Sequence, residues 1–185
     1  PDGDYAALDV RGELFLVPTD PDVGEKRQIT ASAWRQRGAV VAPNGRWIAY
    51  RSDESKEEEI WLFDRDTGAR KKITTHASFK SIDGWSPDSS RLVWTGANRL
   101  FVTAVDSGVT TELGYHRAGG YTVTGWAPDG KWLVMTKRDA SQNADVFLYE
   151  VETRREVNVT QHPWAETQGT ITPDGGKGVF LSNRV

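Results

Sequence analysis

The sequence predicts an all-β fold, a β-propeller built from four-stranded antiparallel blades. A turn motif recurs along the chain, short apolar runs recur around each copy, and no stretch carries the 3.6-residue apolar period of a helix. Each turn contains a proline, then Asp or Asn, then Gly or Ser, and the prolines stand at positions 1, 43, 87, 128 and 173. The steps of 42, 44, 41 and 45 residues match the period of propeller blades.

The turn itself predicts a hairpin. In Pro128-Asp129-Gly130 the proline presets φ for the second position of a type I turn, and the aspartate tolerates the third. The glycine then supplies the left-handed conformation that joins two antiparallel strands. In the copy that begins at Pro87, Ser89 replaces the glycine, so we expect a non-glycine residue with positive φ there.

Four short segments per repeat, rich in β-branched and aromatic residues, predict strands rather than helices. The first segment ends two residues before each proline, at Val41, Trp85, Trp126 and Ile171. The second follows the turn, at 5–8, 47–50, 92–94, 132–135 and 179–181. The third covers 14–17, 60–63, 100–102 and 146–149, and the fourth covers 28–30, 72–74, 112–113 and 158–160.

These segments predict one partial propeller domain over residues 1–185, with blades at about 1–30, 31–74, 75–113, 114–160 and 161–185. Three blades are complete, the first lacks its innermost strand, and the last has only its first two strands. We expect the chain to be an excerpt of a longer protein whose true N-terminus lies upstream. Because blades bury their apolar faces only against one another, we expect most tryptophans in the core and self-association through the open blade ends.

Composition excludes several classes of function. The 23 basic and 26 acidic residues give a net charge of -3, which argues against a nucleic-acid partner. The chain has no cysteine, which excludes disulfides and thiolate metal sites, and no apolar run of about 20 residues, so we expect no membrane insertion. Residues 64–68 begin like a calcium loop but lack its bidentate glutamate, so we expect a turn, no metal and no cofactor.

No catalytic residue is expected in this chain. The segment Gly84-Trp85-Ser86-Pro87-Asp88 begins like a nucleophile elbow but lacks the final glycine, and Ser86 ends a predicted inner strand. The sequence has neither a phosphate-binding glycine loop nor a His-Glu-x-x-His pair. The chain itself is therefore not expected to be an enzyme.

Three histidines form the candidate binding site. His76, His116 and His162 precede their repeat prolines by 11, 12 and 11 residues, which places them in the same loop of three successive blades. The functional hypothesis is a peptide-facing rim that binds peptide termini or senses pH near neutrality. The alternative is a polar loop position that recurs because the repeats are copies. Adjacent blades are too far apart for a shared zinc ion, whose nitrogen ligands lie about 2.0–2.1 Å away.

The acidic segment 53–59 is predicted on the same face as the histidines, between the second and third strands of its blade. We expect it to be a solvated edge. A mixed acidic and imidazole rim would select peptides by charge.

The motif Trp-Ser/Ala-Pro-Asp-Gly before an apolar strand resembles the WD-like propeller repeats of three families: the periplasmic TolB translocation protein, the prolyl-oligopeptidase group and the tricorn proteases. Longer phrases favour the tricorn family. Residues 11–18 and 43–54 resemble phrases of two successive tricorn blades. The phrases at 85–89, 146–149 and 180–184 are similar to later ones in the same order, so the resemblance spans the chain.

The tricorn resemblance implies a large cytoplasmic serine peptidase that degrades oligopeptides and assembles into rings. In that family propellers form channels and filters, and the catalytic residues belong to a separate region that has no counterpart here. The expected role of this chain is a non-catalytic peptide channel, filter or docking module. Two alternatives stay open: a TolB-like protein-interaction propeller of the cell envelope, and the propeller of a prolyl-oligopeptidase-type enzyme.

Overall fold

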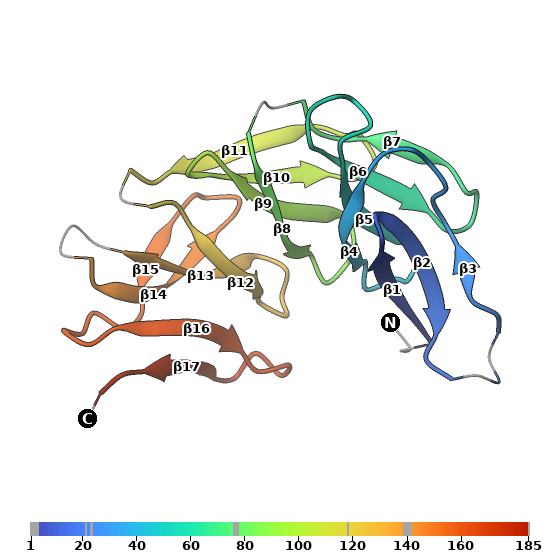
Figure 1. Ribbon diagram of the computed structural model, residues 1–185. Helices are drawn as coiled ribbons and strands as arrows, with labels where there is room; N and C mark the ends of the chain where they lie inside the picture. The colour runs from blue at the N-terminus through green and yellow to red at the C-terminus, as the bar shows by residue number, and fades with distance from the viewer. Residues whose placement is uncertain are drawn as a thin grey trace.

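The computed structural model describes residues 4–20, 22, 24–75, 78–117, 119–138 and 142–184. The described residues form strands and turns and contain no helix, and the strands group into five antiparallel sheets. Each sheet is one blade, and the blades follow one another along an arc (Figure 1). The prediction of a partial propeller with three complete and two incomplete blades is confirmed.

The bounds of the strands follow the repeat. Blade 1 holds β1 (Tyr5–Val10), β2 (Glu13–Pro18) and β3 (Arg27–Gln28). Blade 2 holds β4 (Gln36–Val41), β5 (Trp47–Ser52), β6 (Glu59–Asp64) and β7 (Arg70–Lys72). Blade 3 holds β8 (Lys80–Trp85), β9 (Arg91–Gly96), β10 (Arg99–Ala104) and β11 (Thr110–Tyr115).

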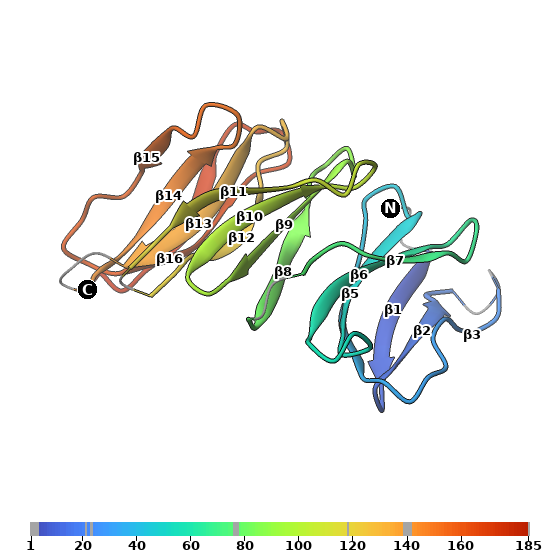
Figure 2. The same ribbon diagram turned by 90° about the horizontal axis from the view of Figure 1, so that it is seen from above.

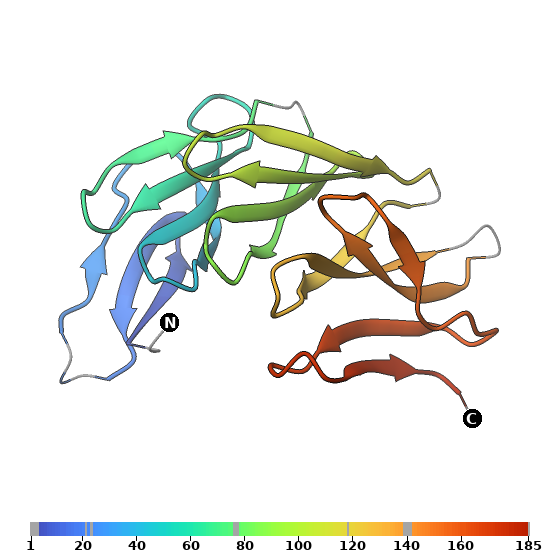
Figure 3. The same cartoon turned by 180° about the vertical axis from the view of Figure 1, so that it is seen from behind.

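Blade 4 holds β12 (Thr122–Trp126), β13 (Trp132–Arg138), β14 (Ala144–Glu150) and β15 (Glu156–Asn158). Blade 5 holds β16 (Glu166–Ile171) and β17 (Gly178–Ser182). Seen from above, the sheets lie side by side in chain order (Figure 2), and from behind the first and last sheets lie at the two ends of the arc (Figure 3).

The repeated turns form as predicted. In the turn before β13, the Gly130 amide donates to the Ala127 carbonyl at 2.9 Å, and φ of Gly130 is 68°. The Asp129 carboxylate accepts the Lys131 amide at 2.9 Å, which explains the preference for Asp or Asn after the proline. Ser89 has φ of 62°, which confirms the expected strained serine. The copy at Pro1 lies outside the described residues.

The apolar core consists of clusters that each span two neighbouring blades. Leu14 and Ile48 belong to the cluster between blades 1 and 2. The cluster between blades 2 and 3 contains Trp94, whose ring stacks on Phe101 at a centroid distance of 4.0 Å. Another cluster joins blades 3 and 4 and includes Met135. The blades therefore bury their apolar faces against each other, as the repeat requires.

Three of the fourth strands end earlier than predicted, because threonine side chains replace the last strand pairing, whereas β11 extends beyond its predicted segment. β3, β7 and β15 end before the predicted segments do. The hydroxyls of Thr30, Thr74 and Thr160 accept amides of the second or third residue of the third strands, at 2.8, 2.8 and 3.1 Å. A hydroxyl acceptor satisfies the amide without further extended backbone.

The prediction that residues 53–59 form a solvated edge is wrong for the last two of them. Glu59 is buried, and its carboxylate lies 3.2 Å from the fully buried Nζ of Lys80 in the next blade. Lys80 Nζ also donates to the carbonyls of Glu58 and Ser78, at 2.7 and 2.9 Å. The charge run is therefore partly an inter-blade connection, since a buried charge requires a partner.

No helix in the described ranges is long and apolar enough to cross a membrane.

Candidate functional site

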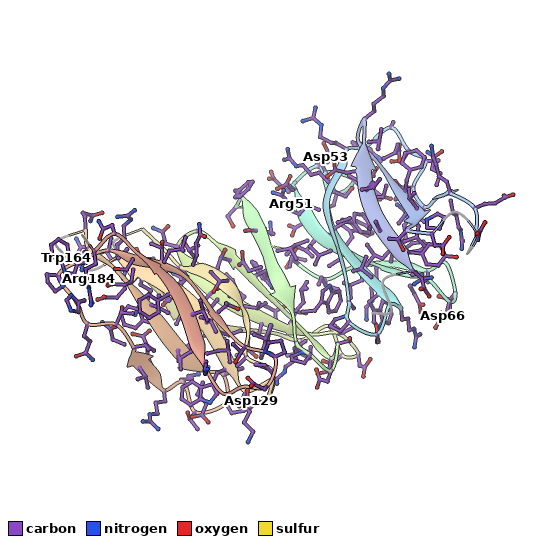
Figure 4. All side chains as sticks on the ribbon, turned by 90° about the horizontal axis from the view of Figure 1, so that it is seen from below. Arg51, Asp53, Asp66, Asp129, Trp164 and Arg184 are labelled. Carbon is purple, nitrogen blue, oxygen red and sulfur yellow. The ribbon has the colours of Figure 1, made fainter. Side chains whose placement is uncertain are left out.

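One face of the row of blades, which we name the loop face, carries the candidate site. It consists of the loops between second and third strands and the loops that lead from each fourth strand to the next blade. Arg51, Asp53 and Trp164 lie along this edge, whereas Asp66 and Asp129 lie along the opposite edge (Figure 4). The predicted histidine loops belong to the loop face.

Among the described residues, three pockets open on the loop face, each between two successive blades. The pocket between blades 1 and 2 has a volume of about 540 Å³ and includes Trp34 and Arg35. The pocket between blades 3 and 4 measures about 320 Å³ and includes Phe79 and Tyr121. The third, between blades 4 and 5, measures about 310 Å³ and includes Thr136 and Arg138. Volumes of this size lie at the lower end of the range for small ligands.

Between blades 2 and 3 the chain fills the corresponding position with its own charged side chains. Arg37 Nε donates to Glu58 Oε2 at 2.6 Å, and Arg51 Nη1 donates to Glu58 Oε1 at 3.3 Å. Arg51 also donates to the Lys80 carbonyl at 3.1 Å, and its guanidinium lies 5.1 Å from the centre of the Phe79 ring. This triad of Arg37, Arg51 and Glu58 ties blade 2 to blade 3.

Exposed aromatic side chains accompany the pockets. Trp34, Phe79 and Trp164 lie in the loops that enter the inner strands β4, β8 and β16 and are 45%, 69% and 40% exposed. Aromatic rings offer a large contact area at a low entropic cost, and their exposure on one face is typical of a binding surface.

The structure places two of the three predicted histidines on this face. His116 follows β11, and its ring lies 5.7 Å from the Tyr121 ring. The His162 carbonyl accepts the Asn143 side-chain amide at 2.7 Å in the loop before β16. The Nδ1 atoms of both histidines are buried and have no hydrogen-bond partner among the described residues. Neither histidine lines the three pockets above, and His76 lies outside the described residues.

Beneath the pocket between blades 3 and 4, Asp83 occupies a bulge in inner strand β8. Burial raises the pKa of its carboxyl to about 6, and hydrogen bonds from Thr95 and Ser81 oppose the shift. Its Oδ2 is buried without a partner among the residues described. A carboxyl in such a setting keeps its proton up to about pH 6 and is ionised above it.

On the opposite face the turns are held by ion pairs. Arg46 Nη2 donates to Asp64 Oδ2 at 2.7 Å, and this contact holds the pKa of Asp64 well below its usual range. Asp66 donates its amide to Asp64 Oδ1 at 2.9 Å, so the segment that imitates a calcium loop forms the expected turn. Within the described residues no group of three or more His, Asp or Glu side chains could hold a metal ion.

The residues that fill or line the spaces between blades were not predicted from the sequence. Arg37, Ser81 and Thr122 stand six residues before their repeat prolines, so an alignment of the repeats on the prolines groups them. That alignment shows a change from a charged to a small side chain between blades. It does not show that the change opens a pocket, because the pocket requires the neighbouring blade.

Comparisons with known proteins agree with this architecture. The family model described as PD40, TolB beta propeller domain, matches residues 11–183. The Tol-Pal system protein TolB of Wolinella succinogenes is 25% identical over 139 residues, which are 71% of this chain and 32% of that protein. The chain spans 52% of the length of a second curated relative, from Agrobacterium fabrum, at 26% identity over 152 residues, which are 80% of this chain.

Solved structures show the same fold at low sequence identity. A putative TolB from Agrobacterium tumefaciens superposes with a TM-score of 0.73 at 23% identity, over 98% of this chain and 67% of that one. The tricorn protease superposes with a TM-score of 0.78 at 16% identity, over 98% of this chain and 18% of that one. Both likenesses concern the propeller fold.

Proposed function

This chain belongs to the PD40 family of TolB β-propeller domains, and we propose that it is a non-catalytic docking module that binds peptide segments on its loop face. The observation that carries the proposal is the row of three inter-blade pockets on one face, accompanied by exposed aromatic rings. An extended peptide that crosses several blades places successive side chains in successive pockets. Binding then follows from aromatic contact and from the few polar groups in each pocket.

We place this module in a tricorn-like cytoplasmic peptidase, as a channel or filter for oligopeptides. The order of the phrases along residues 11–184 supports this context. In such a protein the module acts by steric and electrostatic selection: the rigid row of blades restricts the route of the peptide, and the loop charges orient it.

A second candidate is a TolB-like module that binds a folded protein partner in the cell envelope. The relative from Wolinella succinogenes, which is named a Tol-Pal system protein, favours this candidate. The two candidates differ in the size of the ligand, because a docking site for oligopeptides binds short peptides without a folded partner.

The proposal is tested by nuclear magnetic resonance with glycine amides as reporters on both faces. We expect a pool of blocked hexapeptides to shift the amide resonances of Gly12, Gly96 and Gly120, which lie at the loop face. The amides of Gly45 and Gly130, in the turns of the opposite face, should keep their positions. Peptides that shift neither set would contradict peptide docking, and shifts with a folded partner protein alone would favour the TolB-like candidate.

A pair of variants locates the binding surface. The first, a double variant with alanine at both Trp34 and Trp164, should weaken peptide binding by about fivefold or more, because exposed aromatic anchors contribute strongly to interfaces. Val109, which is 61% exposed in a turn of the opposite face, supplies the control variant Val109→Ala. Equal weakening in the control would count against the loop face.

A further inference from the structure

The pocket between blades 4 and 5 corresponds to the position that the charged triad fills between blades 2 and 3. Strand register establishes the equivalence. Arg37 pairs with Arg51 across β4 and β5, and Thr122 pairs with Thr136 across β12 and β13.

The third member of the triad, Glu58, also has a smaller counterpart in blade 4, Ala144. Glu58 directly precedes Glu59, which pairs with Ser52. Ala144 directly precedes Asp145, which pairs with Lys137. Thr122, Thr136 and Ala144 thus replace Arg37, Arg51 and Glu58, and all three line the pocket.

The pocket walls carry donors for an anion. Thr136 is 9% exposed, and its buried hydroxyl has no hydrogen-bond partner among the described residues. Arg138 lines the pocket, and in the described part of the chain it has no ion-pair partner. Its Nη1 donates to the Gln142 carbonyl at 2.9 Å, which leaves further guanidinium donors.

Among the described residues, the acidic side chains next to the pocket residues contact other groups. None of the residues that line it in the described structure is acidic. Lys137 is paired with Glu156. Glu166 precedes Thr167 in β16, so its side chain lies on the other side of that strand, and its Oε1 accepts the Ser182 hydroxyl at 2.9 Å.

Gln168 adds a backbone feature to the same wall. It lines the pocket at the irregular register of β16, with φ of 53°. A non-glycine residue in the left-handed region carries strain, and such strain often accompanies binding sites.

We propose that this pocket binds the carboxylate of an acidic side chain, a glutamate or aspartate of the docked peptide. Between blades 2 and 3 the carboxylate that closes this position belongs to Glu58 of the chain itself. Between blades 4 and 5, where Ala144 replaces that residue, the ligand supplies the carboxylate. Arg138 and the Thr136 hydroxyl then donate to it, and the charge-assisted bonds make the pocket selective for acidic residues. The inference rests on the proposed docking of peptides to the loop face.

The test compares two blocked pentapeptides, one with a central glutamate and one with glutamine in its place. Titrations followed at the amides of Gly119 and Gly120 should show the glutamate peptide binding about tenfold more tightly, because hydrogen bonds to a charged group exceed neutral ones. Blocked termini remove the end charges, so the side chain is the single difference. Equal affinity for the two peptides would overturn the proposed carboxylate site while leaving peptide docking intact. If neither peptide shifts any loop-face glycine, docking itself fails.

Three variants assign the selectivity to the pocket. Arg138→Gln, at an exposed position, should reduce the preference for glutamate to about twofold or less. Arg155→Gln removes the same charge from an exposed turn on the opposite face and should keep the preference. Ala144→Glu supplies a carboxylate from the chain, as Glu58 does in blade 2, and should abolish the preference. A preference that survives Arg138→Gln would contradict the proposal.

Discussion

Ser89 shows how one side chain can compensate for backbone strain. It is buried and holds φ of 62°, a conformation that costs a non-glycine residue free energy. Its hydroxyl accepts the Asn44 amide of blade 2 at 2.9 Å, so the residue joins the turns of two blades. Glycine, which stands at this position in the other repeats, relieves the strain but makes no such bond.

Two variants should therefore separate the cost of the backbone strain at Ser89 from the stabilisation by its hydrogen bond. Ser89→Ala keeps the strain and loses the hydrogen bond, and it should lower the free energy of unfolding by about 1–2 kcal/mol. Ser89→Gly loses the bond and the strain together and should stay within about 0.5 kcal/mol of the parent. Urea denaturation measures both, and an alanine variant as stable as the parent would show that the bond contributes nothing.

The buried carboxyl of Asp83 should make the stability of the protein depend on pH. Because burial raises the pKa of its carboxyl to about 6, above the unfolded value, the folded state holds this proton more tightly. Its contribution to stability is therefore lost as pH rises from about 4 through 6. Asp83→Asn should be more stable than the parent at pH 7.5, by up to about 2–3 kcal/mol, with little difference at pH 4.

Thermal unfolding of the two proteins across this range gives the comparison. The difference between them, rather than either curve, isolates Asp83 from other titrating groups such as Asp88. The hydroxyl of Ser86 and the backbone of Ser90 lower the pKa of Asp88 to about 2, so this carboxyl titrates at a lower pH than Asp83 does. A constant difference between parent and variant would exclude the titration of Asp83.

At the scale of elements, a buried polar residue opens three of the four inner strands, and that of β8, Lys80, joins its strand to the preceding blade. Gln36, Lys80 and Glu166 open their inner strands at the same repeat position, and all are fully buried. The ammonium group of Lys80 has at least three polar partners, since Nζ contacts the Glu59 carboxylate and two carbonyls of the loop face.

Lys80→Met should destabilise the protein by about 3–5 kcal/mol, because it leaves the buried Glu59 carboxylate and two carbonyls without their cation. Lys72→Met, at an exposed position of outer strand β7, is the matched control and should change stability little. Chemical denaturation of both variants tests the comparison. A double variant, Lys80→Met with Glu59→Gln, should recover part of the loss, since it removes the unpaired charge.

At the scale of the whole molecule, the terminal sheets expose apolar surface. In β17, Val179, Phe180 and Leu181 are 53%, 41% and 58% exposed. Exposed apolar strands favour association. We expect this 185-residue chain to form dimers or larger assemblies in light scattering, and Val179→Lys with Leu181→Lys to lower the mass toward a single chain. A parent that stays monomeric at high concentration would refute the expectation.

The strand order could be predicted from the sequence with few errors, because the signals are local. Each inner strand ends at the residue predicted from its proline, such as Trp85 before Pro87. The errors fall where side chains replace backbone, as Thr74 does at the end of β7, or where a charge run contacts another blade, as Glu59 does. The pockets of the loop face were not predicted, and of the predicted histidines His116 and His162 do not line them.

The order of the residues specifies the four-stranded repeats, the positions of their turns and the direction of the chain through each blade. These features depend on residues a few positions apart, so proline, glycine and alternating apolar residues specify them. Which spaces between blades are filled and which are open depends instead on how whole blades pack against each other. Arg51 fills its space and Thr136 leaves one, because each faces a neighbouring blade whose contacting residues lie far away along the chain.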